Sequence, residues 1–280
     1  MGFLYLFIAI ASESAAKTID KLNFSKTRIA SRHLMLLVFV AMSVSLLLFI
    51  ILTNRPLPEL SLIPIILLSL IGLISFGGNV LDFLSLKADD LSLREPLVDF
   101  EPILAGLVGY LLFPAERQPG FLLAFGLGAL IVYWGTHRRK LRKLQRKGMF
   151  YLVLAVLLYA LLPSLYKLTL EYVSPEYITF FRVVSILLLT VIFNPVKKLK
   201  SLSPPKIVYG FASGIIYAIG AVASLYVIKT FGVVVTALLH LLGPALRYTS
   251  GYLILKEKVR RGEVVSSFLL AVVILATIFI

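Results

Sequence analysis

The chain has no cysteine among its 280 residues. Disulfides, thiol chemistry and metal or cluster sites built on cysteine are therefore excluded. Charge is also scarce, because Asp, Glu, Lys and Arg make up only 15% of the sequence, well below the share in soluble domains. The three histidines, His33, His137 and His240, are far apart and have no metal-ligand spacing. No metal and no cofactor are predicted.

Apolar residues are what the sequence has in excess. They make up 59% of the chain, and the mean hydropathy is +0.96. Apolar runs of about 20 residues, long enough to cross a hydrocarbon core of about 30 Å, recur along its whole length. This pattern predicts an all-α, polytopic integral membrane protein embedded in a lipid bilayer.

Polar and proline-containing segments divide the apolar runs into ten predicted transmembrane helices. The first is the weakest, because Glu13, Lys17, Asp20 and Lys21 interrupt it. The predicted ranges are 2–20, 33–53, 61–86, 92–113, 119–136, 149–170, 176–194, 206–228, 232–255 and 262–280.

The basic residues alternate between loops. Loops that follow odd-numbered helices hold about 21 Lys and Arg, whereas those that follow even-numbered helices hold about three. By the positive-inside rule, the basic loops face the cytoplasm, and both termini lie on the outer side of the cytoplasmic (plasma) membrane. The net charge of +14 is therefore attributed to loops beside anionic lipid, and no nucleic-acid partner is predicted.

Two halves of the chain repeat a series of residues in the same order, which predicts two five-helix repeats at 1–140 and 141–280. Because five is odd, the two copies would be inverted in the membrane. At an offset of 150, one set of residues matches: Ser14 with Ser164, Lys17 with Lys167 and Arg32 with Arg182. At an offset of 142, a second set matches: Lys87 with Lys229, Pro102 with Pro244, Gly109 with Gly251 and Tyr110 with Tyr252.

These residues resemble the EamA-like family of the drug/metabolite transporter superfamily. The features that carry the resemblance are Arg32 and Arg182 at the start of the second helix of each half, and fourth helices that contain Pro, then Gly, and close in Glu-Arg or Glu-Lys ("FEPILAGLVGYLLFPAER", "LGPALRYTSGYLILKEK"). The Trp-Gly pair common in the first helix of each half is replaced here by Ala9-Ile10 and Tyr159-Ala160.

The resemblance implies a secondary transporter, a permease or exporter, that moves a small metabolite by alternating access. A flippase for lipids or lipid-linked sugars and a non-transporting structural bundle are the alternatives. An enzyme is not predicted: "GFASG" lacks the spacing of a nucleophile elbow, and "KADD" has no second acidic cluster with which to bind a metal diphosphate. Substrate, transport direction, coupling ion and homo-oligomerisation stay open.

Ionisable residues inside the predicted helices are the candidate substrate-binding groups, since a charge at mid-membrane usually faces a cavity or a partner. His240 and Arg247 lie on one helical stripe with Pro244 between them, and either line a polar cavity or hold the bundle together by ion pairing. Glu13 and Lys17 are four residues apart on one helical face. Either they form an ion pair and neutralise each other, or Glu13 is a proton carrier. His240 is the other candidate for proton coupling.

Further candidates come from the third and sixth predicted helices. Asn79 and Asp82 continue a polar stripe, and Tyr166 and Lys167 follow a proline. Lys167 either attracts an anionic group or extends to the membrane interface. Small residues from Gly210 to Ser224 predict close helix packing. Hinges are predicted at Gly77, Gly78, Pro102, Pro163 and Pro244.

Overall fold

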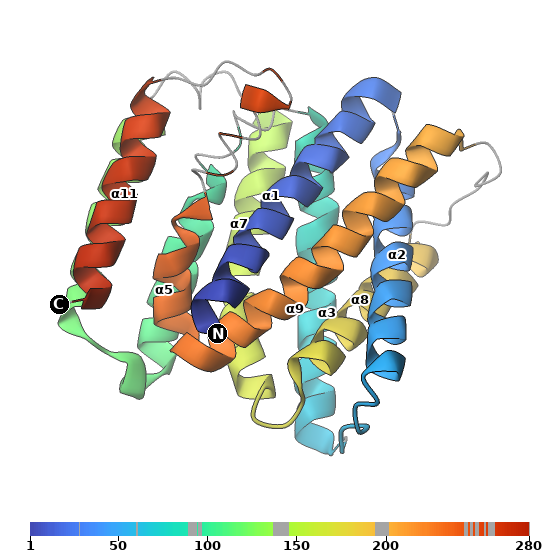
Figure 1. Ribbon diagram of the computed structural model, residues 1–280, viewed down its shortest axis with the longest axis horizontal. Coiled ribbons are helices and arrows are strands. Elements are labelled where there is room, and N and C mark those ends of the chain that lie inside the picture. Colours follow the sequence, from blue (N-terminus) through green and yellow to red (C-terminus); the bar gives the residue numbers. More distant parts are fainter. Residues whose placement is uncertain are drawn as a thin grey trace.

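A computed structural model of the chain describes most of it. The described residues are 1–27, 29–59, 61–88, 94, 97–136, 146–193, 202–243, 246, 249, 252–254, 256 and 261–279. Every regular element in these ranges is a helix (Figure 1). Helices are expected, because a helix satisfies its backbone hydrogen bonds within one segment and lipid offers no substitute partner.

The helices follow one another with short connections. Their bounds are α1 Gly2–Thr27, α2 Ser31–Leu52, α3 Leu62–Ala88, α5 Phe100–Leu112, the 3₁₀ turn η1 Pro114–Glu116, α6 Pro119–Thr136, α7 Arg146–Thr169, α8 Pro175–Phe193, α9 Pro204–His240 and α11 Arg261–Phe279. Six of them, α1, α2, α3, α7, α8 and α9, are long and apolar enough to cross a membrane. The chain is therefore an integral, multi-pass membrane protein.

The predicted count of ten helices is not confirmed, since the described residues form nine α-helices. The predicted helices 206–228 and 232–255 are joined in α9, which continues to His240 across a single non-helical residue, Gly232. One glycine with φ 80° and ψ −179° redirects the chain there, so no loop is needed. The first helix is also longer than predicted and reaches Thr27, with its charged residues inside it.

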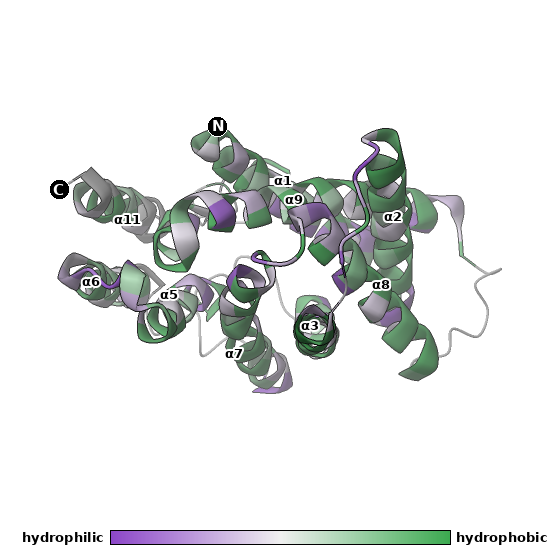
Figure 2. Ribbon diagram, turned by 90° about the horizontal axis from the view of Figure 1, so that it is seen from below, coloured by the Kyte–Doolittle hydropathy of each residue, from purple (hydrophilic) through white to green (hydrophobic). Residues whose placement is uncertain are grey.

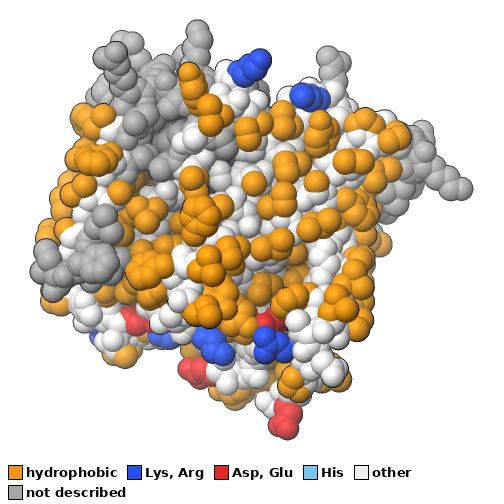
Figure 3. Space-filling model, in the orientation of Figure 1, with side chains coloured by type: hydrophobic (Ala, Val, Ile, Leu, Met, Phe, Trp, Pro, Cys, Tyr) orange, Lys and Arg blue, Asp and Glu red, His pale blue; other side chains and the backbone are white. Residues whose placement is uncertain are grey.

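The outer surface carries a broad apolar belt. Large side chains such as Leu48, Ile51, Leu123 and Phe193 are exposed. On the face shown in Figure 3, hydrophobic side chains cover the middle, Lys and Arg lie near the upper end, and Lys, Arg, Asp and Glu lie near the lower end. This distribution is that of a protein whose middle zone contacts lipid rather than water.

Helices from the two halves of the chain pack on one another. α1 packs along α9 and α7 along α3; α2 packs on α9 and α8 on α3; α5 packs on both α7 and α9. At one end of the molecule α6 packs on α11, and at the other α2 packs on α8 (Figure 2). Most of these contacts join elements far apart in the sequence.

Close packing of α9 depends on glycines, as the sequence predicted. A Cβ atom at Gly214 would lie 2.4 Å from the carbonyl oxygen of Val38 on α2, and one at Gly210 would lie 2.7 Å from Leu37. Gly220 approaches Ser12 of α1 in the same way. Any side chain at these positions would push the helices apart, so glycine allows α9 to occupy the centre of the bundle.

Candidate substrate cavity

A cavity of about 240 Å³ lies inside the bundle, between α1, α2, α3, α5, α7, α8 and α9. Much of its wall is apolar, with Val38, Phe39 and Met42 on one side. Its polar lining residues, tyrosines included, come from both halves of the chain and are Glu13, Lys17, Asn79, Asp82, Glu101, Tyr159, Tyr166, Thr179, Arg182, Tyr217, Ser224, Thr236 and His240. An apolar chamber with a few convergent polar groups is typical of a small-molecule site.

The predicted pair on α1 forms within this cavity. Lys17 Nζ lies 2.8 Å from Glu13 Oε1, one helical turn away. Both side chains are partly buried, with 12% of Lys17 and 31% of Glu13 exposed. The pair therefore places a carboxylate and an ammonium group side by side on the wall, and their opposite charges cancel.

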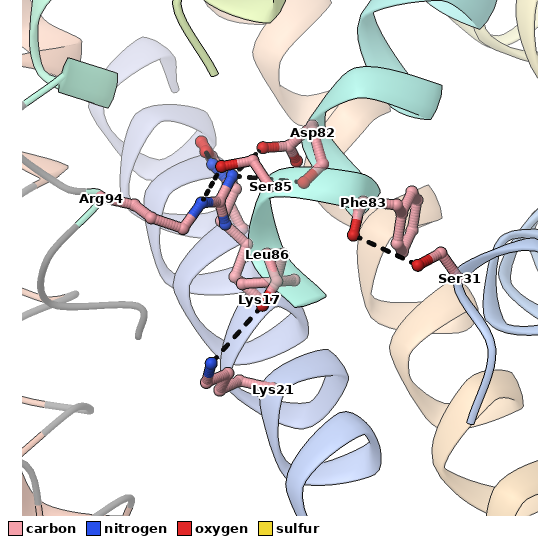
Figure 4. A network of polar contacts seen from close by, with 9 residues as sticks. Lys17, Lys21, Ser31, Asp82, Phe83, Ser85, Leu86 and Arg94 are labelled. Atoms are coloured by element: carbon pink, nitrogen blue, oxygen red, sulfur yellow. Dashed lines mark hydrogen bonds and ion pairs between the residues drawn. The ribbon is translucent and has the colours of Figure 1, made fainter. Parts of the chain in front are cut away.

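Asp82, on the last turns of α3, forms an ion pair with Arg94 (Figure 4). Arg94 is almost completely buried and also donates from Nε to Ser85 Oγ at 3.0 Å. Nearby, Lys21 donates to the Leu86 carbonyl oxygen and Ser31 to that of Phe83. These contacts tie α1, α2 and α3 together at one end of the cavity.

Asn79 lies one turn before Asp82 and also lines the cavity. Its amide Nδ2 donates to the Ser75 carbonyl oxygen at 2.7 Å, within the same helix. The Ser75 hydroxyl in turn accepts from Arg182 Nε at 3.0 Å, which links α3 to α8. The polar stripe predicted on α3 therefore faces the interior of the bundle.

Lys167 differs from the other candidates, because it is not among the cavity-lining residues. It forms an ion pair with Glu116 and lies 4.2 Å from the centre of the Phe113 ring. Glu116 also accepts hydrogen bonds from the backbone N–H groups of Val233, at 3.2 Å, and Val234, at 2.8 Å. This cluster joins both halves of the chain at the end of α7.

The comparisons with known proteins agree with this architecture. Residues 146–280 match the EamA-like transporter family. These residues are therefore an EamA-like segment, which supports a place for the chain in the drug/metabolite transporter superfamily. No curated protein matches. Among 28 matching chains of solved structures, one described as "Crystal structure of protein" is 16% identical, with a TM-score of 0.67 over 95% of this chain and 97% of that one. At such low identity the likeness shows the fold alone.

The family and the apolar helices identify a membrane transporter of the drug/metabolite type, which implies a small-molecule substrate. Four of the predicted hinge residues lie in the described part of the chain. Pro102 and Pro163 line the cavity, Gly77 faces Leu158, and a Cβ at Gly78 would lie 2.6 Å from the Tyr159 ring. Their hinge roles stay predictions.

Two candidates, Arg247 and Pro244, lie outside the described residues. His240, the other polar member of their stripe, lines the cavity at the end of α9. Within the described part of the chain, no group of three or more His, Asp or Glu side chains could hold a metal ion.

Several lining residues were not candidates in the sequence. In the sequence Arg182 stands out only by its match with Arg32 in the repeat and as a family feature. Tyr159 and Tyr217 carry no sequence signal of their own, since aromatic residues are common throughout the chain. Only helix packing shows that they face the same space.

Asp20 is a further finding, because its side chain is completely buried between α1 and α9. Neither carboxylate oxygen has a hydrogen-bond partner within the described ranges, although Ser213 and Tyr217 lie nearby. Tyr217 lines the cavity, which places this carboxylate just beyond the wall. Unsatisfied buried polar groups are costly, so the position is an unusual one for an acid.

Proposed function

We propose that this protein is a secondary transporter that moves a small metabolite across the cytoplasmic membrane by alternating access. The observation that carries the proposal is the central cavity, whose polar lining comes from α1, α3 and α5 of the first half and α7, α8 and α9 of the second. A substrate site between two halves, inside an otherwise apolar bundle, is the usual arrangement in secondary transporters.

The packing pattern supports two inverted five-helix repeats at 1–140 and 141–280. If α1, α2 and α3 correspond to α7, α8 and the first part of α9, then exchanging the halves turns each contact into another observed contact. α1 on α9 becomes α7 on α3, and α2 on α9 becomes α8 on α3. An approximate two-fold axis in the membrane plane would produce such pairs.

Ion pairs at both ends of the bundle support alternating access. Asp82 lies near the end of α3 and Lys167 near the end of α7. α3 and α7 lie side by side, and they run in opposite directions in the proposed inverted arrangement. The Asp82–Arg94 and Glu116–Lys167 pairs are then on opposite sides of the cavity. Opening either side would require its pair to separate while the other holds.

The proposed binding groups are the candidates that line the cavity, namely Glu13, Lys17, Asn79, Asp82, Tyr166 and His240. Glu13 and His240 are the two through which proton coupling would act, because a carboxylate and an imidazole can each take up a proton near neutral pH when their surroundings favour it. Charge bias places both termini outside the cytoplasm. A C-terminal reporter that is active only outside the cytoplasm would agree, and cytoplasmic activity would reverse the orientation.

The test combines a ligand screen with a blocked cavity. Purified protein is screened against pooled metabolites by thermal shift, and compounds that stabilise it are assayed by counterflow in liposomes. Ala221→Phe places a ring in the cavity, whereas Ile219→Phe changes an exposed position on the same helix. We expect counterflow to be lost in the first variant and kept in the second.

Counterflow that persists in Ala221→Phe would place the pathway elsewhere and refute the proposal. If no soluble metabolite is exchanged and labelled lipid crosses the bilayer instead, the protein would be a flippase of the same fold rather than a metabolite transporter. Circular dichroism of both variants checks that they remain folded.

A further inference from the structure

We propose that Arg182 and Tyr166 form an anion subsite in the central cavity, so that the transported molecule carries a carboxylate or phosphate group. This inference rests on the proposed transport function and adds a substrate class to it.

Arg182 is a cation deep in the membrane with unused donors. It is the eighth residue of the 19-residue helix α8, about 10 Å along the axis at 1.5 Å per residue, and therefore near mid-membrane. Its Nε donates to Ser75 Oγ at 3.0 Å. A guanidinium group has five N–H donors, so within the described residues most of them remain available for a ligand.

Within the described part of the chain, no carboxylate forms an ion pair with Arg182. Two acids on the same cavity wall are paired elsewhere, Glu13 with Lys17 and Asp82 with Arg94. An unpaired charge at this depth is costly, which is why such residues usually mark a substrate or ion path. An anionic substrate group would supply the missing partner.

Tyr166 provides a second, independent donor. The guanidinium carbon of Arg182 lies 5.8 Å from the centre of the Tyr166 ring, a cation–π contact that holds the arginine against α7. Only 8% of Tyr166 is exposed, and its buried hydroxyl has no hydrogen-bond partner among the described residues, although Ser75 is close by. A buried hydroxyl without a partner on a cavity wall is a donor prepared for a ligand.

The two donors suit an oxyanion better than other groups. Guanidinium N–H groups bind the paired oxygens of a carboxylate or phosphate in a fork, and the phenol O–H can donate to one of them. Three acids of the cavity, Glu13, Asp82 and Glu101, come from the first half of the chain, whereas Arg182 and Tyr166 come from the second. An anionic end would therefore lie toward α7 and α8.

Four probes that share one ring separate the chemistries: benzoate, phenyl phosphate, benzamide and benzylamine. Their binding to the purified full-length protein is measured by thermal shift and by isothermal titration. We expect benzoate or phenyl phosphate to stabilise the wild type, and the one that binds better tells carboxylate from phosphate. The neutral amide and the ammonium compound should bind more weakly.

Arg182→Gln should lower the affinity for the anionic probe by about tenfold or more, since charge-assisted hydrogen bonds are lost. Tyr166→Phe should lower it less, and Arg182→Lys should retain part of the binding. Arg117→Gln is the matched control, because this exposed arginine donates, among the described residues, only to the Tyr110 and Leu111 carbonyl oxygens. If Arg182→Gln fails to fold, Tyr166→Phe still tests the subsite.

Anionic probes that bind equally to wild type and Arg182→Gln would overturn the subsite. Binding of only benzamide or benzylamine would overturn it too and leave the transporter proposal intact. If no probe binds, the subsite is refuted, while the counterflow of metabolites described above decides separately whether the protein transports.

Discussion

Gly232 offers the sharpest test of the fold, because two separate features of the structure require a glycine there. Its φ of 80° and ψ of −179° lie in a region that side chains disfavour. A Cβ atom would also lie 2.3 Å from Glu116 Oε1 and 2.7 Å from its Cδ. Gly232→Ala should therefore strain the backbone and displace Glu116 at the same time.

The expected loss in the free energy of unfolding is the sum of the backbone strain and the cost of displacing Glu116. Backbone strain of this kind costs about 1–3 kcal/mol. Displacing Glu116 removes its hydrogen bonds to the N–H groups of Val233 and Val234 and its ion pair with Lys167. A hydrogen bond to a charged group contributes about 1.5–3 kcal/mol, and water can replace some of these at the end of the bundle. Together the free energy of unfolding should fall by about 3–6 kcal/mol.

The assay is unfolding of the purified protein in mixed micelles with increasing SDS, followed by circular dichroism. A double-mutant cycle separates the two parts: in a Glu116→Ala background, Gly232→Ala should cost only the strain of about 1–3 kcal/mol. Gly126→Ala on α6 is the control, since a Cβ there meets nothing within 4 Å, and it should be neutral or slightly stabilising. A change below about 0.5 kcal/mol in Gly232→Ala, or the same cost with and without Glu116, would refute the reasoning.

Two further substitutions test the cavity and the helix packing. Asp82→Asn leaves the buried Arg94 without its carboxylate and should lower the free energy of unfolding by about 3–5 kcal/mol in the same SDS titration; a loss below about 1 kcal/mol would mean that the pair does not form. Gly106→Ala places a Cβ 2.0 Å from the buried ring of Phe125, so α5 and α6 must separate at a cost of about 1–3 kcal/mol. Phe125→Leu should recover part of that cost, and an unchanged midpoint in Gly106→Ala would contradict the described packing of α5 on α6.

The sequence was enough to predict a membrane protein. A helix that crosses lipid needs a long apolar segment, and such segments are visible in the sequence and its composition. Glu13 and Lys17 were also readable as a pair, since their spacing alone brings them together on one helix. The glycines of α9 also predicted close packing, because small residues on one face of a helix allow a neighbour to approach whichever helix that neighbour is.

The partners across helices were decided only by the tertiary structure. Arg94 is not among the candidates that the sequence offers, yet it is buried against Asp82. Lys167 was expected either near the substrate or at the interface, and it pairs with Glu116 from the other half of the chain. Arg182 and Tyr166 became neighbours only through the packing of α7 and α8. In a membrane the side of a helix that faces lipid and the side that faces another helix are both largely apolar, so hydrophobic periodicity does not tell which face meets which neighbour. Composition and local spacing therefore determined the membrane helices and the pairs within them, whereas the cavity and the contacts that close it depend on how those helices pack.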